Sequence, residues 1–371
     1  MICYNWYGDR MKKILTFLGV FCLVVTLTAC GSKSSKTGDK PSEKEEKKDI
    51  EFTKDINVVT SLEDTILDNT TWCGTFNLVW NILKEEFVKG DIIVDNPTEQ
   101  ILNLNKTVFN KSYLSDNGYY TKVGKQTPET KSEIEKAIKE KFNQTSDILN
   151  SFNWEENSTV DFIYAMLYKK FTFKTPFKQL ENSGFNGNGD YRYFGIDDDN
   201  RDGSDQVDVL YYSDKGHAIK LQTKENEEII LVSTNDKINN FNDLYKQVME
   251  NEKTYKGSKK IEKDDGVFVP YLKFNLYKEF DELAGLKFKQ SDGSERQINK
   301  AVQTIQFQLS ESGGDIKSEA AISTEMTSAY DPDKQPRYFS YNTSFVIYLK
   351  EKDKDLPYFA AYVTDLSKFQ K

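Results

Sequence analysis

The sequence predicts an α+β fold, mainly antiparallel sheets with several helices, in a single domain from residue 50 to residue 371. Stretches with the spacing of helices are concentrated in the first half, and strand-like stretches dominate from Tyr191 onward. The chain contains 24 Phe and 21 Tyr, residue types that favour sheets. No linker after Asp49 is long enough to separate two domains.

Two helices are expected in the first half. Residues 75–89 place apolar side chains at helical spacing, and Gly90 ends that pattern. Residues 130–142 begin at Thr130, and Glu133 three positions later completes a capping box.

Two further segments of this half are strand-like. Residues 91–94 form a short apolar run that ends at Asn96-Pro97, which indicates a strand. Residues 159–173 form a long aromatic and aliphatic run, which fits either a strand or a buried helix.

The second half is expected to be mostly sheet. The predicted strands are residues 207–212, 218–223, 228–232, 267–274, 301–309, 345–349 and 358–363. Short turns separate the first three, which predicts a meander, and the last two are predicted to pair. Residues 241–249 are predicted to form a short helix.

The N-terminus carries the features of an export signal. Met11-Lys12-Lys13 is cationic, residues 14–27 are mostly apolar, and Leu27-Thr28-Ala29-Cys30-Gly31 follows directly. The apolar run is too short to cross about 30 Å of hydrocarbon comfortably. We therefore expect residues 1–29 to be a signal peptide, with translation starting at Met11.

The Leu-x-Ala-Cys ending resembles the lipobox of bacterial lipoproteins, which implies that Cys30 receives a lipid. Residues 31–49 contain no large apolar side chain, so residues 30–49 are expected to form a lipidated, solvated tether. The expected location is the extracytoplasmic face of the cell membrane, bound through the N-terminal lipid. A plain signal peptide or a buried apolar helix is the alternative.

Composition restricts the function. The formal net charge of −9 leaves no basic footprint for nucleic acid. Cys3 and Cys22 lie in the expected signal peptide and Cys30 carries the lipid, so Cys73 has no disulfide partner. Such a cysteine is more often a small buried hydrophobe than a nucleophile.

Enzymatic activity is the least supported class of function. His217 is the only histidine, which leaves little for Ser-His-Asp catalysis or a zinc site made of several histidines. It closes a predicted turn that starts at Ser213, so we expect a solvated loop histidine. The chain shows neither a glycine-rich phosphate loop nor a nucleophile elbow, and no organic cofactor is expected.

One acidic motif indicates a metal site. Asp198, Asn200 and Asp202, followed by Gly203, match the opening of a calcium-binding loop, in which alternating oxygen ligands converge on one cation. The bidentate glutamate expected six residues after the glycine is replaced by Val209. A hydrated acidic turn is therefore the alternative to a calcium site.

A second motif lies near the C-terminus, after Gly313-Gly314. Residues 318–324 read Ser-Glu-Ala-Ala-Ile-Ser-Thr and resemble the hinge of a serpin, whose E-x-G-x-E-A-A-x-x-T segment leads into an exposed reactive loop. The resemblance places this hinge at Ser318, Glu319, Ala320, Ala321 and Thr324. In a strand, the residues at positions 318, 320, 322 and 324 would share one uncharged face.

Other segments resemble the same family in the same order. Residues 76–89 are similar to its first helix, and residues 91–97 stand where N-I-V-F-S-P is usual. Residues 162–177 are similar to the strand pattern L-V-N-A-x-Y-F-K-G-x-W-x-x-P-F, and residues 269–274 to L-P-K-F-K. Residues 345–363 are similar to the closing strand pair but have Ala361-Tyr362 in place of Gly-Arg.

The resemblance implies a protease inhibitor that uses residues 318–337 and a secreted protease as partner. Residues 325–337 would be the bait, and one register of the hinge places the cleaved bond near Asp331-Pro332. Cleavage would let the hinge enter a sheet and distort the bound protease. The alternative is a non-inhibitory binding or structural surface lipoprotein with an unrelated α+β domain.

Overall fold

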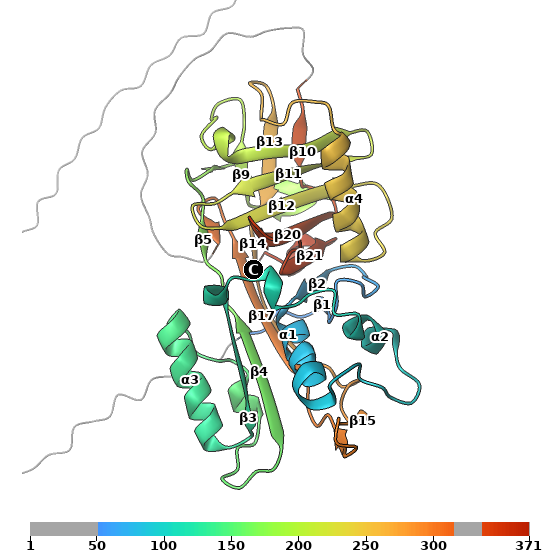
Figure 1. The fold of residues 1–371 in the computed structure, drawn as a ribbon. Helices are drawn as coiled ribbons and strands as arrows, with labels where there is room; N and C mark the ends of the chain where they lie inside the picture. The colour runs from blue at the N-terminus through green and yellow to red at the C-terminus, as the bar shows by residue number, and fades with distance from the viewer. Residues whose placement is uncertain (1–50, 315–335, 371) are drawn as a thin grey trace, which may run out of the picture. The chain divides into compact units, whose positions relative to one another are not determined.

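The computed structural model describes residues 51–314 and 336–370. They form helices and antiparallel-rich sheets (Figure 1), which confirms the predicted α+β fold. The largest sheet has the order β1-β2-β21-β20-β12-β11-β10. Its strands are β1 (Asn57–Val59), β2 (Thr70–Cys73), β10 (Val207–Ser213), β11 (Gly216–Gln222), β12 (Glu227–Thr234), β20 (Phe345–Glu351) and β21 (Phe359–Val363). Neighbours are antiparallel except β1 and β2.

This large sheet contains both groups of strands that the sequence predicted to pair. The meander β10-β11-β12 and the closing pair β20-β21 are confirmed, and β20 joins them by pairing with β12. All seven residues of β20 are buried, because strands and side chains cover it on every side. The sheet therefore contributes a buried strand at the centre of the described residues.

Smaller sheets surround this centre. Two of them are antiparallel pairs of long strands: β3 (Tyr119–Lys125) with β4 (Asp161–Leu167), and β14 (Leu272–Glu279) with β17 (Val302–Leu309). The remaining strands are β5 (Phe171–Thr172) with β18 (Gly313–Gly314), β7 (Ser183–Phe185) with β8 (Asn188–Tyr191), β15 (Lys287–Lys289) with β16 (Glu295–Gln297), and a sheet of β19 (Tyr338–Ser340), β13 (Gly266–Pro270), β9 (Tyr193–Ile196) and β6 (Lys178–Gln179).

Four α-helices lie within the described residues: α1 (Thr75–Ile82), α2 (Glu99–Asn105), α3 (Pro128–Phe142) and α4 (Phe241–Thr254). A π-helical turn, Leu83–Val88, continues α1. One face of α3 packs on β4, where Ile134, Ile138 and Phe142 share a small core with Phe162 and Tyr164. No helix in residues 51–314 and 336–370 is long and apolar enough to cross a membrane.

The strand predicted at residues 91–94 is wrong. This segment has no regular structure, because the side-chain amide of Asn105 bonds both the backbone N–H and the carbonyl of Ile92. The strand of this region is β2, which precedes α1 rather than following it. Residues 91–97 as a whole form no strand.

Several predicted boundaries change. The hydroxyl of Thr127, not that of Thr130, caps α3, with Pro128 as its first residue. The predicted strand 267–274 is two strands in different sheets, β13 and β14, separated at Tyr271. Of the two structures left open for residues 159–173, the strand is correct, as β4 and β5. α4 extends five residues beyond the predicted end at Met249.

Candidate functional site

Strands β4 and β17 run in the same direction. Near their first residues, the Arg296 guanidinium before β17 lies 3.8 Å from the carboxylate of Asp161 in β4. Beyond their last residues, the chains pair again through Phe171–Thr172 and Gly313–Gly314. Both strands therefore start at one end of the site and finish at the other.

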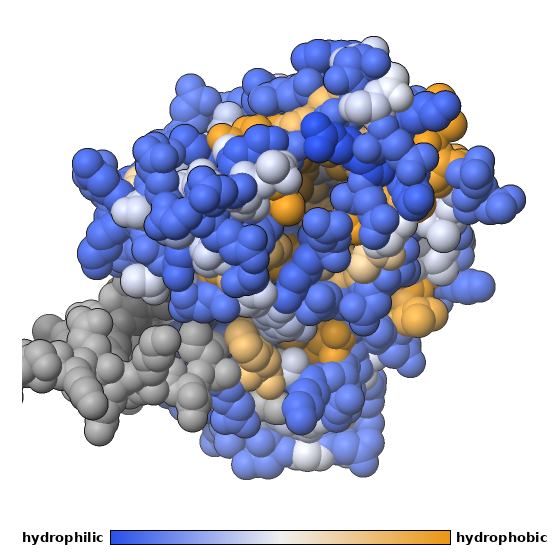
Figure 2. Space-filling view, turned by 90° about the horizontal axis from the view of Figure 1, so that it is seen from below, coloured by the Kyte–Doolittle hydropathy of each residue, from blue (hydrophilic) through white to orange (hydrophobic). Residues whose placement is uncertain are grey.

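A groove lies between these two strands. Every residue of β4 and residues 302–308 of β17 line it, and its volume is about 890 Å³. Within the described residues, β4 pairs only with β3 and β17 pairs only with β14, so each strand keeps one unpaired edge. Figure 2 shows a hollow with apolar residues inside and a largely polar rim. Unpaired strand edges of this kind are templates for an added strand.

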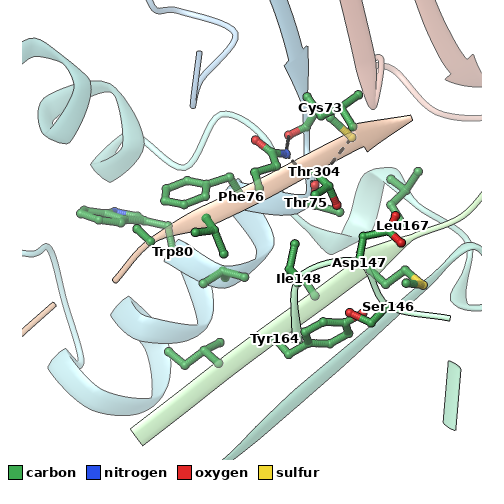
Figure 3. Close-up of a pocket in the computed structure, with 18 of the residues that line it drawn as sticks. Cys73, Thr75, Phe76, Trp80, Ser146, Asp147, Ile148, Tyr164, Leu167 and Thr304 are labelled. Atoms are coloured by element: carbon green, nitrogen blue, oxygen red, sulfur yellow. Dashed lines mark hydrogen bonds between the residues drawn. The ribbon is translucent and has the colours of Figure 1, made fainter. Parts of the chain in front are cut away.

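Helix α1 provides the apolar floor of the groove. Phe76 and Trp80 are buried, whereas Val79, Leu83 and Phe87, spaced by four residues, are only partly covered (Figure 3 labels Phe76 and Trp80). Val79 lies in α1, whereas Leu83 and Phe87 lie in the π-helical turn that continues it, and all three line the groove. The floor is therefore a partly exposed apolar stripe.

A polar cluster interrupts this apolar floor. The side-chain amide N–H groups of Gln303 donate to the Cys73 carbonyl at 3.0 Å and to the Thr75 hydroxyl at 2.7 Å (Figure 3). Cys73 is buried, as predicted, and burial raises the pKa of its thiol, so it is held in the neutral form. Its position at the end of β2 fits a packing role better than nucleophilic chemistry.

The connection between α3 and β4 reaches the far wall of the groove. Ser146, Asp147 and Ile148 line the groove from this connection (Figure 3). Farther along, the Lys300 ammonium donates to the Ser151 carbonyl at 3.0 Å and lies 5.4 Å from the centre of the Phe152 ring. Lys300 precedes β17, so the connection links the two walls.

A tight turn joins β17 to β18, which pairs with β5 just beyond the end of β4. Gly313 exchanges backbone hydrogen bonds with Ser310, and its φ of +122° lies in the region that favours glycine. A Cβ atom on Gly313 would lie 2.4 Å from the Phe171 carbonyl oxygen, so glycine is required for this close approach.

The chain after this turn is described again from residue 336. Arg337 bonds the carboxylate of Asp265, the hydroxyl of Tyr255 and the carbonyls of Ser258 and Lys260. The described residues on both sides of the gap are therefore held in place. The predicted hinge residues Ser318, Glu319, Ala320, Ala321 and Thr324, the bond at Asp331-Pro332 and the lipidated Cys30 lie outside the described residues.

The acidic motif forms a turn whose side-chain oxygen atoms accept hydrogen bonds from its own backbone. The Asp197 carboxylate accepts hydrogen bonds from the backbone N–H groups of Asp199 and Asn200. The side-chain carbonyl oxygen of Asn200 accepts a hydrogen bond from the backbone N–H of Asp202. No group of three acidic, His or Cys side chains suited to a metal was found in residues 51–314 and 336–370. Calcium binding by Asp198, Asn200 and Asp202 stays a prediction.

The expectation of a solvated loop histidine is wrong. His217 belongs to β11, and its ring packs against those of Tyr212, Phe339 and Tyr341 at 5.2 to 5.8 Å. Burial lowers the pKa of His217 to about 4, which keeps the ring neutral at pH 7. Phe339 and Tyr341 are distant from His217 in sequence, so no local sequence pattern predicts that the His217 ring is buried.

Comparison with known proteins gives matches to solved structures but none by sequence. No protein-family model matches the chain, and no curated protein matches its sequence. Solved structures do match, and serpins are among them.

Serpin48 of the insect Tenebrio molitor is 14% identical, with a TM-score of 0.40 over 69% of this chain and 78% of that chain. A thyroxine-binding globulin, solved with thyroxine, is 11% identical, with a TM-score of 0.46 over 82% of this chain and 93% of that chain. Tengpin, a thermophilic serpin in its native state, is 14% identical, with a TM-score of 0.41 over 76% of this chain and 71% of that chain.

Proposed function

We propose that this chain is a serpin-like protease inhibitor, anchored by a lipid on Cys30 at the extracytoplasmic face of the cell membrane. The groove between β4 and β17 is the observation that carries the proposal. It offers two unpaired strand edges, and the chain leaves β17 through Gly313-Gly314 at one end of it.

The direction of the two strands favours insertion of this same chain. The chain already reverses direction in the tight turn between Ser310 and Gly313, so a segment that continues in the same direction past Gly314 would run antiparallel to both β4 and β17. The seven residues of β4 span about 23 Å at about 3.3 Å per residue. The hinge-like residues 318–324 are equally numerous, and the face formed by alternate residues carries no charge.

The mechanism would be mechanical. A protease that attacks a peptide bond within residues 325–337 forms an acyl bond to the new C-terminal end and releases the new amine. If residues 318–324 then enter the groove before this acyl bond is hydrolysed, the attached protease is carried along and distorted. The free energy for this step would come from the hydrogen bonds formed along both strand edges.

Incubation with a panel of secreted proteases tests the proposal. We expect a complex that survives boiling in SDS, together with cleaved inhibitor whose melting temperature is higher than that of the intact chain. Nicking within residues 325–337 with neither the complex nor a higher melting temperature would contradict the proposal.

Two matched variants test the register of insertion. Ala320→Arg places a charge on the face that would point into the groove, whereas Ala321→Arg places the same charge on the opposite face. We expect Ala320→Arg to be cleaved without forming the complex and Ala321→Arg to retain it. Equal behaviour of both variants would contradict insertion in this register.

Lipid anchoring needs a separate experiment. Cells that express the chain and grow with radiolabelled palmitate should label it and retain it in the membrane fraction. Cys30→Ser should abolish the label and release the protein, whereas Cys73→Ser should not. An unlabelled wild-type chain would contradict the anchor without affecting the inhibitor proposal.

One observation favours a second function. In one register of the hinge, Pro332 would follow the cleaved bond, and a proline at that position is poorly accepted by most proteases. A surface lipoprotein that binds a macromolecule without trapping a protease fits this feature. Resistance of residues 325–337 to every protease in the panel would favour this second function.

A further inference from the structure

Two buried polar atoms at the groove have no hydrogen-bond partner among the described residues. They are the side-chain oxygen of Gln303 and the hydroxyl of Tyr358, and the two residues are 4% and 1% exposed. The amide nitrogen of Gln303 is already bonded to Cys73 and Thr75, which fixes its oxygen as the unsatisfied atom. Such unpaired buried atoms are rare in folded proteins, so they mark a place where a ligand atom would be stabilising.

The apolar part of a ligand has its own place beside these atoms. The row Val79, Leu83 and Phe87 is partly covered and faces the groove, together with the rings of Phe76 and Trp80. The groove volume of about 890 Å³ lies in the range of sites for small organic molecules, about 300–1,000 Å³. An apolar molecule of moderate length could thus cover this stripe.

The charges around the groove select the polar end of such a molecule. Asp147 lines the groove without a salt bridge in the described residues, and burial raises its pKa, as expected for a carboxylate that lacks a cation. Lys169, also at the groove, already serves two carboxylates, those of Glu227 and Glu351. The unsatisfied Gln303 oxygen is an acceptor. Of the other cations that line the groove, Arg296 and Lys300 lie 3.8 Å and 3.6 Å from the carboxylates of Asp161 and Glu279, and the Lys273 side chain is exposed. At the buried end of the groove, Asp147 and the Gln303 oxygen therefore favour a hydrogen-bond donor over an anion.

We propose that the groove binds an apolar chain that ends in a hydrogen-bond donor without negative charge, as in a long-chain alcohol or alkylamine. The donor group lies at Gln303 and Tyr358, and the apolar chain covers Val79 of α1 and Leu83 and Phe87 of the π-helical turn. This site does not depend on protease inhibition. Its consequence rests on the proposed function: an occupied groove has no room for an inserted strand, so the ligand would regulate trapping.

Isothermal titration of the exported chain (residues 30–371 with Cys30→Ser, so no lipid is present) tests the site. The probes are decanol, decylamine and decanoate, each below the concentration at which it forms micelles. We expect decanol and decylamine to bind and decanoate to bind at least about tenfold more weakly, a difference of about 1.4 kcal/mol. Equal binding of decanoate, or no binding of any probe, would overturn the proposal.

Variants locate the site. Leu83→Arg places a charge in the apolar stripe and should abolish binding, whereas Leu67→Arg, at a position 65% exposed and outside the groove, should leave it unchanged. Asp147→Asn should weaken the binding of decylamine relative to that of decanol. This comparison tests the site even if Leu83→Arg fails to fold. Binding that survives Leu83→Arg in a folded protein would place the ligand elsewhere.

The two proposals fail separately. The titration contains no protease. A failure of the probes to bind would therefore say nothing about whether the SDS-resistant complex forms. If both proposals hold, saturating decanol should lower the yield of the complex while cleavage of residues 325–337 continues. An unchanged yield would contradict the regulatory consequence but not the ligand site.

Discussion

The Lys169 ammonium lies 2.5 Å from the carboxylate of Glu351 although the two residues are 182 positions apart. Lys169 follows β4, the wall of the groove, and Glu351 ends β20, in the middle of the large sheet. A second carboxylate, that of Glu227 in β12, lies 3.1 Å from the same ammonium. One buried lysine thus fixes the end of β4 to two strands of the central sheet.

Lys169→Met should strongly destabilise the protein. The change leaves the carboxylates of Glu227 and Glu351 buried without a cation, which costs about 3–5 kcal/mol in comparable ion pairs. Urea unfolding should show a lower midpoint. The neighbouring Lys170 is exposed, so Lys170→Met should change the midpoint little. A loss below about 1 kcal/mol for Lys169→Met would mean that water reaches the carboxylates.

The pKa values of the two carboxylates are shifted in opposite directions. Burial raises the pKa of Glu227 above its ordinary value of 4.5 more than Lys169 lowers it, and the nearby Glu351 and Glu225 add to the rise. Burial also opposes ionisation of Glu351, but hydrogen bonds from Lys169 and Ser115 hold the pKa of Glu351 below its ordinary value. Lys169 lies nearer to Glu351 than to Glu227, and Ser115 donates two further hydrogen bonds to Glu351, which together account for the difference in pKa.

Glu227→Gln should therefore change how stability depends on pH. Between the unfolded and folded pKa values, folded Glu227 holds more protons than the unfolded chain, so its contribution is lost as the pH rises from about 4.5 through the folded value. Urea unfolding across this range should show wild type losing stability relative to Glu227→Gln as the pH rises. A difference that stays constant with pH would contradict the assignment.

Arg337→Leu should release the chain at residues 336–337 from its contacts with Asp265 and its neighbours. Burial would raise the pKa of Asp265, yet bonds from Arg337 and from backbone N–H groups hold it below its ordinary value. Without Arg337, this buried carboxylate loses its cation, at a cost of about 3–5 kcal/mol.

Urea unfolding of Arg337→Leu measures that cost, and Arg296→Leu is the control, because its exposed pair with Asp161 is worth about 0–1 kcal/mol. The stability that Asp265 adds in wild type should fade as the pH falls through its lowered pKa, and this acid sensitivity should be absent in Arg337→Leu. Equal losses for the two variants would contradict the role of Arg337.

The sequence predicted elements whose signal is local. The meander β10-β11-β12 and the pair β20-β21 were predictable because strand-forming residues and short turns lie together in the chain. β2 was missed because it has only four residues, two of them threonines, and all four are buried, so it shows no alternation. Tyr271 split a predicted strand because the chain there passes from one sheet to another.

The candidate site was less predictable than the fold. The groove depends on the distance between β4 and β17, which are distant in sequence and are joined through the pairing just beyond their ends. Nothing local marks Lys169 among the lysines of residues 169–174, since only the tertiary fold supplies its two carboxylates. The hinge motif indicated where a strand could come from, but not the groove that could receive it.

Gly313→Ala tests the joint between β18 and β5, where the groove ends. An alanine there would need a φ of +122°, and its Cβ would lie 2.4 Å from the Phe171 carbonyl oxygen, so the pairing of Gly313–Gly314 with Phe171–Thr172 should be disrupted. We expect a loss of at least about 1–3 kcal/mol in urea unfolding.

Gly293→Ala separates backbone strain from this collision. Gly293 also has a positive φ, +84°, but no described atom lies within 4 Å of the position of an added Cβ. The loss of stability in Gly293→Ala should therefore reflect backbone strain alone and be smaller than the loss in Gly313→Ala. Faster hydrogen exchange at the backbone N–H of Phe173 in Gly313→Ala would confirm that the joint has opened, because this N–H donates to the Ser312 carbonyl in the turn. Unchanged exchange with equal stability losses would show that the joint tolerates a side chain, and that the end of the groove is less tightly closed than its geometry indicates.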